Sequence, residues 1–335
     1  MTRFAVRTVT AEAPDSDPRY DLTTTLGPLT LPNPVLTASG CAAAGRELDQ
    51  FFDVAALGAV VTKSIMLEPR SGRATPRMAE TPSGMLNSIG LQGPGIEHFL
   101  GHDLPWLQGK GARAVVSIAG GSVEEFAELA TLLRGAPGLA AVEVNISCPN
   151  VANRGLVFAC DPRASGEVVA AVRAATSPAV PVFAKLSPDV TDVVAIARSC
   201  LAAGADGLSL INTLLGMAID TDTMRPVLAG VTGGLSGPAI RPVAVRCIWQ
   251  VHAALPDVPI IGMGGVRTGR DALELIVAGA SAVSVGTAVF NDPSAPVRVL
   301  RELRHALVTR GFATVSEAVG LAHRTAVTTD LEGQL

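Results

Sequence analysis

The sequence lacks any run of about 18 apolar residues, the length that a membrane-spanning helix needs. Its first residues, MTRFAVRTVTAEAPDSDPRY, also lack the apolar centre of a signal peptide. We therefore predict that the chain has no membrane segment. Residues 1–20 are interpreted as a flexible N-terminal tail and residues 324–335 as a C-terminal tail.

Cysteine is scarce and scattered: the chain has five cysteines, and no two of them form a CxxC pair. This pattern excludes a recognisable disulfide framework, zinc site or iron–sulfur site, so we predict no metal and a reducing, cytoplasmic location. The net charge is −4, and no basic stripe is interleaved with aromatic residues, so nucleic acid is not an expected partner. The cysteines are Cys41, Cys148, Cys160, Cys200 and Cys247.

Lysine is rarer still: of the 26 lysine and arginine residues, only three are lysines, namely Lys63, Lys110 and Lys185. A genomic preference for arginine codons accounts for most of this bias. Where a lysine remains, the position can require a compact ammonium on a flexible stem in place of a planar guanidinium.

What the chain does have is a series of short apolar runs rich in valine and isoleucine. Such runs are typical of parallel strands that are buried on both faces. The predicted strands are 33–38, 58–63, 113–118, 141–147, 181–186, 206–211, 258–263 and 281–286. Helical patterns lie between most of them, at 47–57, 122–135, 163–177, 190–203, 239–254 and 269–279. Several of these patterns begin at capping residues, as in the Ser122 and Ser187 segments.

Eight strands that alternate with helices predict an α/β fold, the (β/α)₈ TIM barrel, over residues 21–323. The alternative is an open doubly wound sheet, which the count of eight and the lack of GxGxxG after the first strand disfavour. Residues 21–31 are predicted to form an N-terminal β-hairpin that turns at Gly27 and closes the bottom of the barrel. Two long insertions, about 64–112 and 212–238, follow strands 2 and 6 at the C-terminal face, where barrel enzymes carry their sites.

Polar residues collect where these strands end. Lys63 ends strand 2, Asn145 and Cys148 end strand 4, Lys185 ends strand 5 and Asn212 ends strand 6. Each residue alone has a structural explanation, since a lysine can reach solvent and an asparagine can cap a turn. Their convergence on one face instead favours a site.

Glycine-rich turns follow the last two strands, in GMGGV (262–266) and VGTA (285–288), and GGLSGPAI (233–240) opens a helix. In barrels the loops after strands 7 and 8 commonly bind phosphate with backbone N–H groups. Lys185 could stabilise the negative charge of a reduced flavin, and the two asparagines suit a planar, amide-rich compound. A thiol at this mouth can act as a base, although a buried packing role is the commoner fate of a cysteine.

Seven motifs together resemble dihydroorotate dehydrogenase, and most closely its class 1B catalytic subunit. They run in order along residues 21–323: GMLNSIGLQGPG (84–95), NISCPN (145–150), KLSPDVTD (185–192), INTLLGM (211–217), GGLSGPAI (233–240), IIGMGGV (260–266) and VGTAVF (285–290). Class 2 enzymes are less similar, because they have serine at the position of Cys148 and an N-terminal membrane-associating segment.

The resemblance implies oxidation of (S)-dihydroorotate to orotate in de novo pyrimidine biosynthesis, with FMN at the barrel mouth. Cys148 would remove the C5 proton as general base while hydride passes from C6 to flavin N5. The residues implied for substrate binding are Lys63, Asn87, Ile89, Gly90, Leu91, Asn145, Asn150, Asn212 and Thr213. Those implied for FMN are Ala38, Ser39, Thr62, Lys63, Asn145, Lys185, Ile211, Gly237, Gly264, Gly265, Gly286 and Thr287.

The resemblance also implies a partner subunit that carries FAD and a [2Fe–2S] cluster and passes electrons to NAD⁺, with catalytic chains forming a homodimer within a heterotetramer. The alternatives are a class 1A-like homodimer that uses fumarate, an FMN enzyme similar to dihydropyrimidine dehydrogenase, and a non-catalytic barrel. In the region expected to cover the site, Arg154 and Phe158-Ala159-Cys160 depart from the family pattern, so its details stay open.

Overall fold

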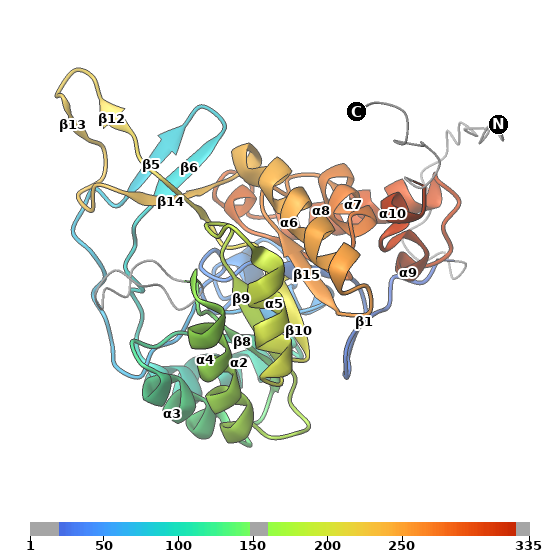
Figure 1. Ribbon diagram of the computed structural model, residues 1–335, viewed down its shortest axis with the longest axis horizontal. Coiled ribbons are helices and arrows are strands. Elements are labelled where there is room, and N and C mark those ends of the chain that lie inside the picture. Colours follow the sequence, from blue (N-terminus) through green and yellow to red (C-terminus); the bar gives the residue numbers. More distant parts are fainter. Residues whose placement is uncertain (1–19, 148–159, 326–335) are drawn as a thin grey trace.

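The computed structural model describes residues 20–147 and 160–325 (Figure 1). Its centre is a parallel sheet with the strand order β3-β16-β15-β10-β9-β8-β7-β4. A parallel bridge between Leu36 and Ala59 joins the two outer strands, so the sheet closes into a barrel. The (β/α)₈ prediction is therefore confirmed, and the open sheet is excluded. The strands are β3 (Val35–Thr37), β4 (Val60–Val61), β7 (Ala114–Ile118), β8 (Leu139–Val144), β9 (Val182–Leu186), β10 (Gly207–Leu210), β15 (Ile260–Met263) and β16 (Ala282–Val285).

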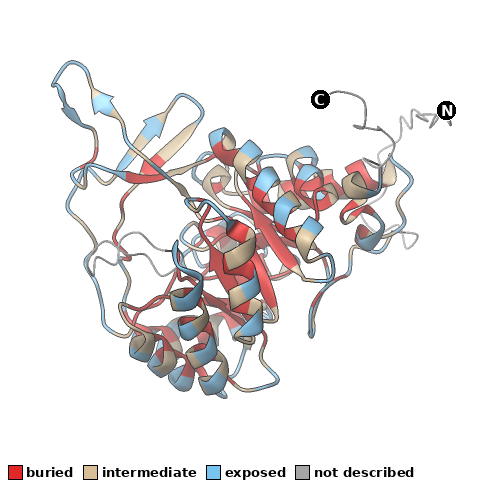
Figure 2. Ribbon diagram, viewed as in Figure 1, coloured by how far each residue is buried: buried red, intermediate tan, exposed pale blue. Residues whose placement is uncertain are grey.

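Helices surround this barrel, and Figure 2 shows their inner faces buried against strands that are buried throughout. The larger ones are α3 (Val123–Leu133), α4 (Pro162–Ala175), α5 (Val193–Ala202), α6 (Arg241–Ala254), α7 (Gly269–Val277) and α8 (Ala295–Val308). Ser122 caps α3 as predicted, because its side chain accepts a hydrogen bond from the Glu125 amide. The cap predicted at Ser187 is wrong. Asp192 caps α5, accepting from the amides of Val194 and Ala195.

The helix predicted over 47–57 is also wrong, because two short 3₁₀ turns replace it: η1 (Leu48–Gln50) and η2 (Val54–Ala56). Conversely, residues after strand β4 form a continuous helical segment that was expected only as part of an insertion. It consists of α1 (Ile96–His98), a π-helical stretch (Phe99–Asp103) and α2 (Leu104–Gly109). In the part of the chain that the structure describes, no helix is both long and apolar enough to cross a membrane.

The N-terminal hairpin closes the bottom of the barrel. Strands β1 (Thr24–Leu26) and β2 (Leu29–Leu31) pair in antiparallel fashion, and the turn places Gly27 at a φ of 61°, which glycine adopts readily. The side chains of Leu26 and Leu31 are fully buried and pack with Phe183 and Ile261 from the barrel interior. The hairpin therefore seals the interior from solvent on the side opposite the strand ends.

Replacing Leu31 with alanine should lower the free energy of unfolding by about 2–5 kcal/mol, since the change leaves a cavity in this seal. Thr30→Ala is the matched control, because Thr30 is exposed on the same strand and its loss should cost less than about 0.5 kcal/mol. Denaturant titration of the two variants checks the difference. Equal stabilities would contradict the packing role of the hairpin.

The two long insertions join each other above the barrel. Strands β5 (Met78–Thr81) and β6 (Gly84–Asn87) come from the first insertion, and β11 (Leu214–Gly216) and β14 (Gly233–Ser236) from the second. They form one antiparallel sheet with the order β11-β14-β6-β5, in which Asn87 pairs with Gly234. A further hairpin, β12 (Ile219–Asp220) and β13 (Arg225–Pro226), projects from this sheet as an arm (Figure 1). The two insertions thus form one wall of the space at the carboxyl ends of the barrel strands.

Candidate active site

A cavity of about 880 Å³ lies at the carboxyl ends of the barrel strands. Barrel strand ends, the insertion sheet and the loops after β15 and β16 all contribute to its wall. Most of the residues that the sequence analysis assigned to a site line this one cavity. They are Ala38, Ser39, Lys63, Asn87, Ile89, Gly90, Leu91, Asn145, Lys185, Ile211, Asn212, Thr213, Gly237, Gly264, Gly265, Gly286 and Thr287.

Among the described residues that were predicted, Thr62 stands apart from this lining. Thr62 is fully buried behind the wall, where its hydroxyl accepts a hydrogen bond of 3.2 Å from the Ser117 amide, so it supports the wall from behind. Cys148 and Asn150 lie outside the described residues, and their roles stay predictions.

An amide cluster forms one side of the cavity. Asn145 follows β8, and its Nδ2 donates to Ser64 Oγ at 2.9 Å. The Ser147 hydroxyl donates to Asn145 Oδ1 at 3.1 Å, and Asn212 Nδ2 donates to Ser147 Oγ at 2.6 Å. These bonds orient both amides before any ligand arrives. Preorganised amides of this kind can recognise a planar compound that alternates donors and acceptors.

A serine cluster behind the amides was missed by the sequence analysis. The hydroxyls of Ser39, Ser64 and Ser117 lie within 3.0–3.2 Å of one another. They come from the ends of three different strands, so nothing local in the sequence connects them. The cluster fixes Ser64, which in turn holds the amide of Asn145.

Two lysines bring positive charge to the strand-end side of the cavity, and Arg267 and Arg298 also line it. Lys185 is almost fully buried on β9, and its ammonium pairs with the Glu143 carboxylate at 3.5 Å. Lys63 is half-buried at the end of β4. Cys41 also lines the cavity, and burial raises the pKa of its thiol to about 11 despite the opposing effect of both lysines. Cys41 is therefore protonated near neutral pH and is unsuited to act as a base.

Glycines line the opposite rim. Gly264 and Gly265 follow β15 with φ values of 127° and 74°, a region where side chains are disfavoured. Gly286 follows β16. Next to it, the Thr287 hydroxyl donates to Ser236 Oγ at 2.8 Å, which ties the loop to the insertion sheet. Glycine-lined strand ends leave backbone N–H groups accessible, as an anion-binding loop requires.

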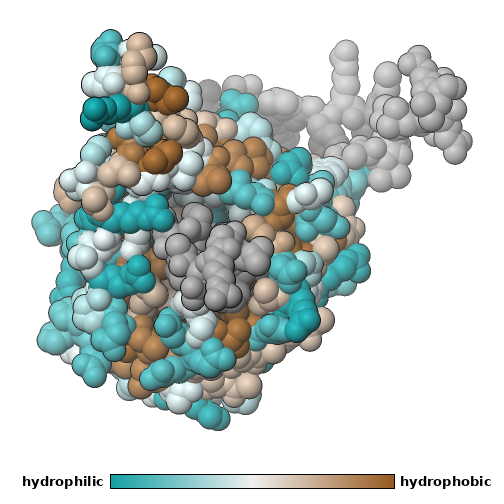
Figure 3. Space-filling view, turned by 60° about the vertical axis from the view of Figure 1, so that its left-hand side comes forward, coloured by the Kyte–Doolittle hydropathy of each residue, from teal (hydrophilic) through white to brown (hydrophobic). Residues whose placement is uncertain are grey.

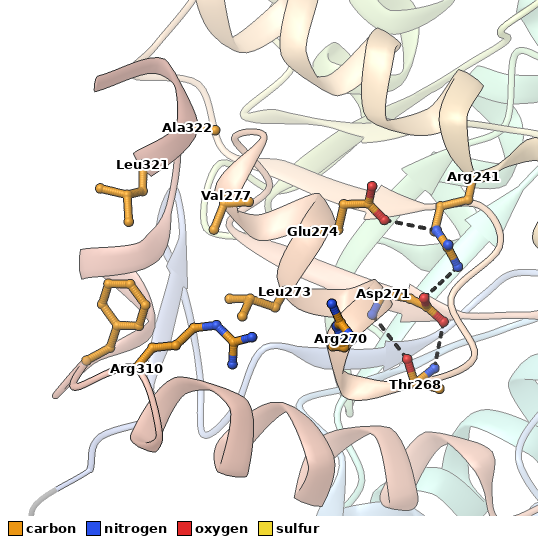
Figure 4. A pocket seen from close by; sticks show the side chains of 11 residues that line it. Arg241, Thr268, Arg270, Asp271, Leu273, Glu274, Val277, Arg310, Leu321 and Ala322 are labelled. Atoms are coloured by element: carbon orange, nitrogen blue, oxygen red, sulfur yellow. Dashed lines mark hydrogen bonds and ion pairs between the residues drawn. The ribbon is translucent and has the colours of Figure 1, made fainter. Parts of the chain in front are cut away.

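A second cavity, of about 750 Å³, lies on the outer side of the barrel along α7 (Figure 4). There Arg241 pairs with Asp271 and Glu274, and Asp271 in turn caps α7 together with Thr268. Its lining contains none of the predicted site residues, and its acidic groups are engaged in these pairs. The first cavity is therefore the candidate active site.

Fold and cavity together define a (β/α)₈-barrel protein with a cationic, amide-lined site at the C-terminal face and glycine loops after its last two strands. The dihydroorotate dehydrogenase family model matches residues 21–307 of this chain. The chain belongs to the dihydroorotate dehydrogenase family.

Curated relatives cover nearly the whole chain. One from Pelobacter propionicus is 53% identical over 300 residues, which span 90% of this chain and 98% of the relative. One from Geobacter sp. (strain M21) is 50% identical over 302 residues, which span 90% of this chain and 98% of the relative. One from Desulforudis audaxviator is 52% identical over 297 residues, or 89% of this chain and 96% of the relative. All three are named "Dihydroorotate dehydrogenase B (NAD(+)), catalytic subunit".

Proposed function

We propose that this chain oxidises (S)-dihydroorotate to orotate, a step of de novo pyrimidine (UMP) biosynthesis, with FMN as its cofactor. One observation carries the proposal: in a chain of this family, a single cavity combines ordered amides, a lysine at the end of a barrel strand and glycine loops after the last two strands. The relatives' printed names point to the same reaction.

The cavity suits FMN in size and in chemistry. About 880 Å³ lies within the usual range for a small-molecule site. The glycine loops offer N–H groups to a phosphate, and Lys185 offers a cation to an electron-rich ring. When bound, FMN would supply the acceptor for the electron pair that leaves the substrate. The residues proposed to hold it are Ala38, Ser39, Thr62, Lys63, Asn145, Lys185, Ile211, Gly237, Gly264, Gly265, Gly286 and Thr287.

The same cavity suits dihydroorotate, which has a carboxylate and a ring with alternating N–H and C=O groups. Lys63 provides a cation for the carboxylate, while the fixed amides of Asn145 and Asn212 match the edge of the ring. The residues proposed to bind the substrate are Lys63, Asn87, Ile89, Gly90, Leu91, Asn145, Asn150, Asn212 and Thr213.

The proposed general base is Cys148, which would remove the C5 proton of the substrate. It directly follows Ser147, whose hydroxyl bonds to both cavity amides. The chain therefore passes the amide cluster one residue before this thiol. Cys41, the cysteine that lines the cavity among the described residues, is held protonated by its burial.

We further propose a partner subunit with FAD and a [2Fe–2S] cluster that passes the electrons to NAD⁺, bound to a homodimer of catalytic chains. The words "catalytic subunit" in the relatives' names support a partner. Apolar side chains also gather on the projecting arm (brown, upper left of Figure 3), where Ile219 is 58% exposed and Met224 78% exposed. Exposed apolar patches commonly mark interaction surfaces. The described cysteines are free thiols, which fits a reducing cytoplasm.

The isolated chain loaded with FMN should reduce an artificial dye when dihydroorotate is added, but it should not reduce NAD⁺. Addition of the electron-transfer subunit should make NADH formation appear, followed at its absorption band. The dye assay without the partner is the internal control for an intact active site. Efficient fumarate reduction by the isolated chain would contradict the partner and favour a fumarate-dependent enzyme, while failure of the dye assay would contradict dihydroorotate oxidation itself.

A further inference from the structure

Glu143 is a charged residue in the interior of the barrel. It lies on β8 two residues before Asn145, and its side chain is fully buried. The register places Glu143 opposite Ser117 on β7 and Phe183 on β9. Successive side chains alternate across a strand, so Glu143 and Asn145 point to the same inner side.

The Glu143 carboxylate depends on Lys185 for its compensation. Its Oε1 lies 3.5 Å from the Lys185 ammonium, whereas its Oε2 is buried and has no hydrogen-bond donor among the described residues. The barrel interior also contains an apolar cluster that includes Phe183, Ile261 and the hairpin residue Leu31. The negative charge therefore lies in a largely apolar interior, next to the lysine that lines the cavity.

Stability alone is a poor explanation for this pair. Two charges that leave water lose hydration, and a buried pair recovers that loss only with good geometry and further hydrogen bonds. At 3.5 Å, with one carboxylate oxygen unpartnered, the Glu143–Lys185 contact is long for a charge-assisted hydrogen bond. Buried pairs of this kind can often be replaced by apolar residues without loss of stability, so the charges point to a role at the cavity.

We propose that Glu143 is a positioning residue that holds the Lys185 ammonium at the end of its strand and sets how strongly the cavity favours reduced over oxidised FMN. The inference rests on the proposed function, because it concerns the cofactor assigned to this cavity. Lys185 and Lys63 both line the cavity, and Glu143 offsets part of their charge from within the barrel.

The direction of the effect follows from electrostatics. Reduction of FMN adds electron density, so nearby positive charge favours the reduced form and nearby negative charge opposes it. Glu143 therefore limits the stabilisation of the reduced cofactor, which keeps it ready to pass its electrons on. Salt screens a buried charge much less than an exposed one.

Glu143→Gln is the test, because glutamine keeps the size and an oxygen acceptor for Lys185 while it removes the charge. Titration of the apoprotein with oxidised FMN, combined with the midpoint potential of the bound cofactor, gives the relative affinity for its two redox states. We expect the preference for reduced FMN to increase about tenfold, which corresponds to a rise of about 30 mV for a two-electron couple. Glu143→Asp, which keeps the charge, should stay closer to the unsubstituted protein.

An unchanged or lowered potential in Glu143→Gln would overturn the inference, as would equal shifts in the glutamine and aspartate variants. If Glu143→Gln does not fold, Glu143→Asp carries the test alone: its carboxylate is withdrawn from Lys185, so a smaller rise in potential is expected and no change would contradict the inference. Failure of the proposed function is distinguishable, because then the unsubstituted chain would not bind FMN or dihydroorotate would not reduce it.

Discussion

Replacing Cys148 with serine is expected to slow the reduction of bound FMN by dihydroorotate by about 10²–10⁴-fold, the usual contribution of a positioned general base. A serine hydroxyl is far less acidic than a thiol, so far less of it is ionised near neutral pH and it is a poorer base in a site built for a thiol. FMN should still bind, because the residues proposed to hold it are unchanged. Anaerobic stopped-flow measurement of flavin bleaching separates this chemical step from binding.

The pH dependence of the same step provides a second signature of Cys148. An ordinary thiol has a pKa of about 8.5 and is mostly protonated at neutral pH. The rate should rise with pH until the thiol ionises, and the serine variant should lose this rise. Cys41 cannot take over the role, because burial raises its pKa to about 11.

Cys160→Ser is the matched control for Cys148→Ser. Cys160 is exposed, and its Sγ lies 4.0 Å from the carbonyl oxygen of Asp189. Partial desolvation of the thiol and the negative charge of Asp189 both raise its pKa. Its replacement should leave the rate of flavin reduction nearly unchanged. Near-normal reduction in Cys148→Ser, or a large loss in Cys160→Ser, would assign the proton transfer to another group.

The eight barrel strands could be predicted because each is a short apolar run that is buried on both faces. In β7, for example, all five residues are buried. Strands of this kind need no distant information, since composition and bounding residues identify them. The order and closure of the sheet then follow from the count of eight.

The helix predicted at 47–57 failed because local side-chain bonds compete with helical ones. Asp53 Oδ1 accepts a hydrogen bond from the Ala55 amide, and Asp49 Oδ1 lies 3.5 Å from the Val54 amide. Aspartate readily makes such bonds and thereby ends one turn and starts another. Apolar spacing over this segment carried no sign of the interruption.

The insertion sheet could not be predicted because its pairing is not local. Asn87 on β6 lies opposite Gly234 on β14, far away along the chain, and its Nδ2 donates to the Gly234 carbonyl at 3.3 Å. Strands of three or four residues carry little signal of their own. Only the folded barrel brings the two insertions to the same side.

The site residues that could be predicted are those at the ends of strands. Residues that only hold other site residues in place could not be predicted in the same way. Lys63, Asn145 and Lys185 are visible in sequence because each follows an apolar run. Glu143 could have been found from strand alternation, since it shares the inner face with Asn145. Ser117 could not, because its role depends on hydroxyls from other strands.

Replacing Gly286 with aspartate is expected to yield a folded but colourless protein. Gly286 lines the cavity directly after β16, where the proposal puts the FMN phosphate. Two like charges about 4 Å apart repel by about 4 kcal/mol at an effective dielectric constant near 20, so FMN affinity should fall by roughly 10³-fold or more. Gly264 and Gly265 are poorer test positions, because a Cβ there would come within 2.8 and 2.7 Å of neighbouring side chains.

Gly286→Ala separates the charge from the added bulk. A Cβ at this position would lie 3.2 Å from Ala38 Cβ and 3.4 Å from Cys41 Sγ, so small shifts accommodate it. The alanine variant should remain yellow and lose less affinity than the aspartate variant, at most about 10–200-fold, since a single methyl group changes pocket binding by about 1–3 kcal/mol. Flavin content after purification and titration of the apoproteins measure both variants. If Gly286→Asp retained one FMN per chain, the phosphate would have to bind elsewhere than at this loop. Equal losses of affinity in both variants would mean that bulk, and not charge, decides whether FMN binds.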